Sequence, residues 1–108
     1  MDTLELENKA INGHCDSAHL VGLLFLTGEG GAAKDVQKGI KYLRLAVDGG
    51  CKESAYILGI TYAAGSDVAQ DFKSACVYFK KAVELGKSEA QLDLNRLQPL
   101  VDVIDRLA

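Results

Sequence analysis

The stretch GLLFLTGEG at residues 22–30 returns at residues 59–67 as GITYAAGSD. Further along, DVQKGIKYLRLAVDGG (35–50) returns as DFKSACVYFKKAVELG (71–86). The first pair of segments is offset by 37 residues and the second by 36, so the change in length falls in the intervening loop, where such changes are best tolerated. The chain therefore contains two full copies of a repeated unit of about 36 residues.

The repeated positions carry the residue types that a pair of antiparallel helices requires. Gly22 and Gly59 lie inside apolar helical runs, where glycine costs about 1 kcal/mol relative to alanine. Its recurrence at the same position predicts a close approach between helices. The other repeated positions fit helix caps: Gly28 and Gly65 as left-handed C-terminal caps, and Asp35 and Asp71 as N-caps.

These signals predict a single domain, 1–108, made only of helices. It would comprise an N-terminal half-repeat (1–13), repeat 1 (14–50), repeat 2 (51–86), and a C-terminal half-repeat with its cap (87–108). The expected helices lie near residues 3–12, 16–27, 36–49, 52–64, 72–85, 88–97 and 99–107, the last beginning at Pro99 because proline is favoured in a first turn.

The composition gives further expectations. The net charge of −3 argues against a nucleic-acid partner, and no apolar run reaches the length of about 18 residues that spans a bilayer. The N-terminal sequence MDTLELENKA resembles no signal peptide, so a cytoplasmic protein with no membrane association is expected. Three cysteines without a signal peptide favour free thiols.

No disulfide is predicted for Cys15, Cys51 and Cys76, because stacked helices lie about 8–10 Å apart and a disulfide needs Cα atoms within about 7 Å. The three are interpreted instead as small buried side chains. No metal site is predicted either, because His14 and His19 would point about 140° apart on a helix. No cofactor is expected, and a hydrolase using a cysteine or histidine in a groove is the remote alternative.

The pattern G-x-x-[YF]-x-x-G, a loop ending in Asp, and A-x-x-Y-x-x-x-A-x-x-x-G resembles the Sel-one-like repeat (SLR) family, a relative of the tetratricopeptide repeats, over residues 14–86. Gly39 departs from the usual alanine, and Asn95 and Gln98 break the third copy, which suggests a C-terminal cap. The resemblance implies a right-handed α-solenoid of stacked antiparallel helix pairs, with about six to seven helices. It also implies a non-enzymatic module that binds a protein or peptide on its concave face.

The concave face of such an array is formed by the first helix of each unit. The residues opposite the packed side of these helices are therefore the predicted partner-binding residues: Leu20, Leu23, Thr27, Ile57, Ile60, Ala64, Asp93 and Arg96. This face is apolar in the two full copies, which often marks an interaction site. The alternative is that the N-terminal half-repeat or a second copy covers it, which would give a passive homodimeric assembly protein.

Two further hypotheses concern the partner. The small size, without an attached catalytic domain, suggests a bacterial immunity protein that neutralises a cognate toxin. The second helices carry a series of basic residues that would form a stripe for an acidic partner or an ordinary solvated face: Lys38, Lys41, Arg44, Lys73, Lys80 and Lys81.

Overall fold

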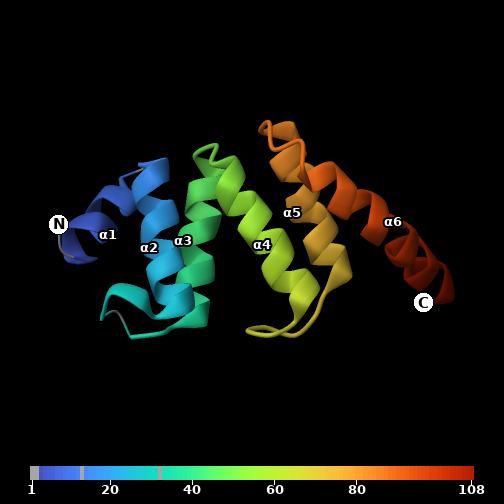
Figure 1. Cartoon of the computed structure of the whole chain (residues 1–108), viewed down its shortest axis with the longest axis horizontal. Coiled ribbons are helices and arrows are strands. Elements are labelled where there is room, and N and C mark those ends of the chain that lie inside the picture. The colour runs from blue at the N-terminus through green and yellow to red at the C-terminus, as the bar shows by residue number, and fades with distance from the viewer. Residues whose placement is uncertain (1–2, 13, 32) are drawn as a thin grey trace. The chain divides into compact units, whose positions relative to one another are not determined.

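The computed structural model describes residues 3–12, 14–31 and 33–108. Three residues of the predicted N-terminal half-repeat, 1, 2 and 13, therefore lie outside the described part. The described residues form six α-helices and one 3-10 turn: α1 (Thr3–Ile11), α2 (Cys15–Thr27), η1 (Glu29–Gly31), α3 (Val36–Asp48), α4 (Lys52–Ala64), α5 (Phe72–Glu84) and α6 (Ala90–Leu107) (Figure 1). The chain divides into two compact units, Met1–Ser54 and Ala55–Ala108.

The N-terminal unit is built on the close contact between α2 and α3, which run side by side in Figure 1. A Cβ atom added to Gly39 of α3 would lie 2.8 Å from the backbone nitrogen of Leu26 and 2.9 Å from the carbonyl oxygen of Gly22. The two helices therefore meet at backbone distance. A Cβ added to the repeated glycine of α2, Gly22, would likewise lie 3.0 Å from the carbonyl oxygen of Gly39, which is the close approach that the repeat predicts. The core beside this contact consists of Ala10, Ala18, Val21, Phe25, Tyr42 and Ala46.

The C-terminal unit pairs α4 with α5 through aromatic rings. The ring centroids of Tyr56 and Phe79 are 5.7 Å apart, and those of Tyr62 and Tyr78 are 5.8 Å apart. The Tyr62–Tyr78 pair is the repeat equivalent of Phe25 with Tyr42 in the N-terminal unit, whose centroids are 6.2 Å apart. Helix α6 packs on α5. The same aromatic positions thus join the first helix to the second in both units.

The predicted caps are present in both copies. Asp35 and Asp71 each accept a hydrogen bond from the backbone N–H three residues later, at 3.1 Å in both cases. Each aspartate also donates its own N–H to a carbonyl of the preceding helix, Phe25 at 2.8 Å and Tyr62 at 2.9 Å. Gly28 has a φ of 78°, and its N–H donates to the carbonyl of Leu24. A short side-chain cap and a closing backbone hydrogen bond therefore fix each inter-helix loop.

The predicted separate helix at 99–107 is wrong, because α6 continues through Pro99 to Leu107. A proline in a helix interior costs about 3 kcal/mol through its missing N–H and its ring. Leu94 and Val101 are buried on either side of Pro99 and lie seven residues apart, which places them on one face of the helix. Packing of this continuous face on α5 offsets the local cost, which is a tertiary effect.

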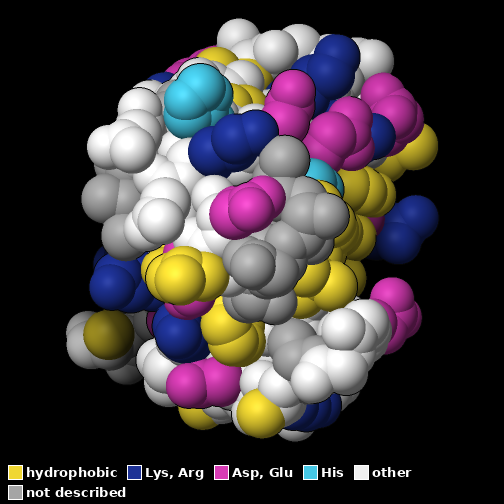
Figure 2. All heavy atoms as spheres, turned by 90° about the vertical axis from the view of Figure 1, so that its left-hand side faces the viewer, with side chains coloured by type: hydrophobic (Ala, Val, Ile, Leu, Met, Phe, Trp, Pro, Cys, Tyr) yellow, Lys and Arg dark blue, Asp and Glu magenta, His cyan; other side chains and the backbone are white. Residues whose placement is uncertain are grey.

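The basic residues of the second helices are partly neutralised within their own units. The Lys38 ammonium lies 3.0 Å from Glu7 and 4.4 Å from the centre of the Phe25 ring. Lys73 pairs with Asp105 at 3.5 Å. At the N-terminal end of the molecule, which faces the viewer in Figure 2, acidic and basic side chains are likewise mixed. These contacts favour the interpretation of an ordinary solvated face over a binding stripe.

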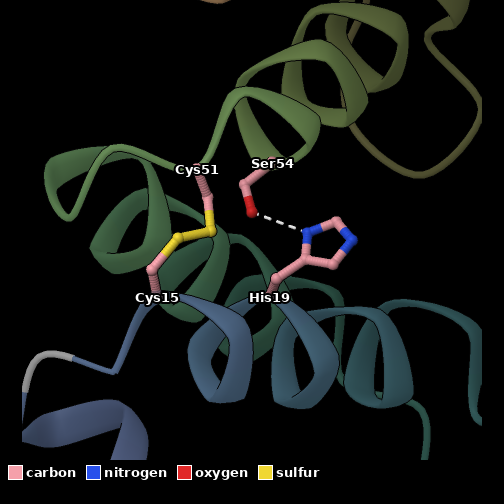
Figure 3. The surroundings of a disulfide bond; sticks show 4 residues. All are labelled: Cys15, His19, Cys51 and Ser54. Carbon is pink, nitrogen blue, oxygen red and sulfur yellow. Dashed lines mark hydrogen bonds between the residues drawn. A yellow bond between two sulfur atoms is a disulfide. The ribbon is translucent and has the colours of Figure 1, made fainter. Parts of the chain in front are cut away.

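Cys15 and Cys51 form a disulfide, with their Cα atoms 5.8 Å apart (Figure 3). The prediction of three free thiols is therefore wrong for these two residues, whereas Cys76 is free and buried as expected. The spacing of stacked helices applies to the bodies of helices. Here Cys15 is the first residue of α2 and Cys51 precedes the first residue of α4, so the bond joins helix ends.

Candidate functional site

A hollow of about 300 Å³ lies on the C-terminal unit, between α4, α5 and α6. Its lining is mostly apolar and carries one acidic and one basic side chain. The lining residues are Ile60, Ala63, Ala64, Phe79, Asp93, Arg96 and Leu97.

The floor of the hollow is the ring of Phe79, which is only 1% exposed. This ring lies against α4 at Gly59, where an added Cβ would come within 2.6 Å of two ring carbons. The ring also packs at a tilt against Tyr56. Because Gly59 has no side chain, the aromatic ring can sit close to the α4 backbone, and this fixes the position of the floor.

The rim of the hollow carries two charged side chains, Asp93 and Arg96, which differ in their polar contacts. The Tyr56 hydroxyl donates to a carboxylate oxygen of Asp93 at 3.0 Å, and this hydrogen bond, followed by burial, raises the pKa of Tyr56. Arg96 is exposed, and within the described part of the chain no carboxylate pairs with its guanidinium. The rim therefore presents a carboxylate that already accepts one hydrogen bond and a guanidinium that no described carboxylate pairs with.

The structure brings together four of the eight predicted partner-binding residues. Ile60, Ala64, Asp93 and Arg96 all line the hollow, whereas Ile57 is half-buried on α4 outside the lining. The remaining three belong to α2 in the N-terminal unit: Leu20 is exposed, Leu23 is half-buried, and the Thr27 hydroxyl donates to the Leu23 carbonyl at 2.8 Å. That these eight residues contact a partner stays a prediction.

Sequence reasoning missed three lining residues: Ala63, Phe79 and Leu97. Two of them follow from helical spacing, because Ala63 lies three residues after Ile60 and Leu97 lies four residues after Asp93. Phe79 belongs to a second helix, whereas the predicted binding face was taken only from first helices. Its role as the floor depends on how α5 meets α4.

The hollow is suited to recognition. Among the described residues that line it there is no cysteine or histidine. Cys15 and Cys51 are bonded to each other, so the hydrolase hypothesis loses two candidate nucleophiles. Burial raises the pKa of the third, Cys76, which disfavours the reactive thiolate.

No described helix combines the length and apolar character needed to cross a membrane.

Similar proteins share the repeat. The rat (Rattus norvegicus) protein DAP3-binding cell death enhancer 1 is 33% identical over 98 residues, which cover 91% of this chain but only 18% of that protein. The crystal structure of a Sel1 repeat protein from Oxalobacter formigenes matches with a TM-score of 0.74 and 28% identity, over 86% of this chain and 69% of that one. The structure of c5321, a protective antigen of uropathogenic Escherichia coli with an SLR fold, matches with a TM-score of 0.77 and 29% identity, over 87% of this chain and 20% of that one.

These likenesses confirm the predicted all-α fold class, an α-solenoid of the SLR type. Repeats of this kind generally mediate protein–protein interactions. The Sel1 repeat profile matches residues 15–51 and 52–87, which together make up more than half of the sequence. The chain belongs to the Sel1 repeat family.

Proposed function

We propose that this chain binds a protein or peptide partner through the hollow of the C-terminal unit. The observation that carries the proposal is the exposed apolar lining beside the available guanidinium of Arg96. Arginine and large apolar groups dominate the energetics of many interfaces. The family's general role in protein–protein interaction supports the proposal, and the name of the rat relative states that it binds a protein, DAP3.

The lining indicates what kind of segment would fit. An aliphatic or aromatic side chain would cover the exposed side chains of Ile60 and Ala64 above the Phe79 ring, removing their apolar surface from water. A neighbouring carboxylate would pair with Arg96, where a bidentate contact adds geometric selectivity. Asp93 already accepts one hydrogen bond, from the Tyr56 hydroxyl, whereas no described carboxylate pairs with Arg96. The expected ligand is therefore an apolar side chain flanked by an acidic residue.

A phage-displayed library of random peptides tests the proposal. We expect the selected peptides to share an apolar residue next to Asp or Glu. Ile60→Glu and Arg96→Glu should each weaken their binding at least tenfold, which is about 1.4 kcal/mol. Ile60 is 41% exposed, so the first substitution leaves the core intact. Leu92→Glu is the matched control on α6, because Leu92 is 67% exposed and lies outside the hollow.

Two results would contradict this function. Selected peptides that bind both hollow variants as tightly as the unchanged protein would show that the hollow is not the binding site. Equal losses in Leu92→Glu would point to a general effect of added negative charge. A Leu20→Glu variant, at a position 45% exposed on α2, reports separately on whether the predicted residues of the N-terminal unit take part.

The narrower hypotheses about the partner belong to the same proposal. As an immunity protein, the chain would rescue cells from a toxic protein that it binds, and Ile60→Glu would abolish the rescue. As a homodimeric assembly protein, it would give a dimer mass by light scattering.

A cytoplasmic location is the expectation from the N-terminal sequence, although the Cys15–Cys51 disulfide is more typical of an oxidising compartment. Trapping thiols in intact cells with an alkylating reagent would distinguish the two.

A further inference from the structure

The disulfide of the N-terminal unit lies beside the carboxylate of Asp16, in the first turn of α2. The two sulfur atoms of Cys15 and Cys51 and a carboxylate oxygen of Asp16 all lie within 4.8 Å of one another. Asp16 is exposed, and both cysteines are half-buried. Two sulfur donors and one oxygen donor therefore converge at a point that opens to solvent on one side.

Non-covalent contacts hold the two cysteines in place independently of the S–S bond. The backbone N–H of Cys51 donates to the carbonyl of Ala46 at 2.9 Å, which closes the turn after α3. One turn further along α2, His19 Nδ1 lies 2.6 Å from the Ser54 hydroxyl oxygen. Figure 3 shows this hydrogen bond beside the disulfide, joining α2 to the start of α4. The sulfur atoms should therefore stay close together when the disulfide is reduced.

The donor set matches the preferences of zinc. Zn²⁺ binds cysteine thiolates at about 2.3 Å and carboxylate oxygens at about 2.0–2.2 Å, in tetrahedral geometry. Donors around such an ion lie within about 4 Å of one another, which a modest opening of the reduced pair provides. The exposed side at Asp16 leaves a fourth position for water or for a ligand from a partner.

We propose that the reduced chain binds one Zn²⁺ through Cys15, Asp16 and Cys51, and that oxidation to the disulfide abolishes this site. A dithiol reductant opens the disulfide by giving up two electrons and two protons, and it becomes a disulfide itself. Binding of Zn²⁺ then displaces the two thiol protons. This site uses neither His14 nor His19, the two residues whose orientation on a helix led to the prediction of no metal site.

The test uses the full chain, reduced with a water-soluble phosphine, which is converted to its phosphine oxide. The reductant is then removed under oxygen-free conditions. Zinc is titrated in competition with a metallochromic chelator. We expect one zinc per chain and release of about two protons at pH 7, since cysteine thiols are then largely protonated. The oxidised protein and the Cys15→Ser and Cys51→Ser variants should bind at least a hundredfold more weakly. Asp16→Asn should bind about tenfold more weakly.

Two matched controls should keep the affinity of the reduced protein: Cys76→Ser, which removes the remaining thiol, and Asp48→Asn, which removes another exposed carboxylate of the same unit. Circular dichroism follows the fold in parallel. The proposal is overturned if the reduced protein takes up no zinc. This applies both to a reduced protein that stays folded and to one that unfolds and does not recover its helices when zinc is added. Unchanged affinity in Asp16→Asn, or loss of affinity in Cys76→Ser, would equally overturn the three-residue site.

Discussion

Substituting Gly39 by alanine tests the close contact of α2 with α3. Alanine is the residue at the equivalent position of the second copy, Ala75, where it is fully buried. At Gly39, however, the new methyl group would lie 2.8 Å from the Leu26 nitrogen and 2.9 Å from the Gly22 oxygen. Both are backbone atoms, so no side-chain rotation relieves the contact and the two helices must move apart.

Two opposing effects set the size of the change. Alanine gains about 1 kcal/mol over glycine in a helix interior. Overpacking of a close contact costs about 1–3 kcal/mol, and the upper end applies because backbone atoms are involved. We expect Gly39→Ala to lower the free energy of unfolding by about 2 kcal/mol. For a chain of this size, that lowers Tm by about 10 °C.

Urea and thermal unfolding, followed by circular dichroism, measure this change. The matched control is Gly49→Ala, at the end of the same helix. There φ is −83°, and the nearest atoms to an added Cβ lie 3.5 Å away, so alanine fits without strain and stability should hold or rise slightly. If Gly39→Ala proves as stable as Gly49→Ala, the backbone-distance contact between α2 and α3 does not exist in solution.

Three more predictions concern local groups. Opening the Cys15–Cys51 disulfide, with its sequence separation of 36, should lower the free energy of unfolding by about 3–4 kcal/mol in metal-free buffer; an unchanged urea midpoint would contradict the pairing. Asp71→Ala should cost about 1 kcal/mol at neutral pH by removing a helix N-cap. The hydrogen bond from the N–H of Ser74 lowers the pKa of Asp71. The cost of the substitution should therefore shrink as pH falls through that lowered pKa. A difference in the free energy of unfolding between Asp71→Ala and the unchanged protein that stays constant in acid would refute this prediction. Burial lowers the pKa of His19 below its ordinary 6.5, although two nearby carboxylates oppose the shift. Stability due to neutral His19 should thus be complete above pH 6.5 and lost as pH falls through the lowered pKa, and His19→Gln should lack this part of the acid dependence in unfolding titrations.

The sequence was sufficient for features that recur in both copies. Local sequence determines the caps at Asp35 and Asp71, and the repeat reveals the glycine contacts at Gly22 and Gly59. Each feature could be predicted because the same residue type occurs at the same position in both copies. The helix bounds followed for the same reason, apart from small shifts at the ends. Helix α6 has no complete second copy for comparison, and there the local preference of Pro99 gave the wrong boundary.

The disulfide and the floor of the hollow could not be predicted, because both depend on contacts between distant residues. Cys15 and Cys51 pair because the turn after α3 brings the start of α4 to the start of α2, a path set by the Cys51–Ala46 backbone hydrogen bond. Helical spacing finds Ile60 and Ala64 on one face, but not the ring that comes from another helix.

One residue that lines the hollow occupies a position where the two copies differ. The residue that meets the first-helix glycine is Leu43 in the first copy and Phe79 in the second. One turn earlier, Gly39 of the first copy is replaced by Ala75 in the second. Both differences put more volume between the helices of the second copy, and Phe79 is the floor of the hollow. The positions that agree between copies therefore hold the helix pairs together, whereas the enlarged pair supplies the apolar base of the proposed binding site.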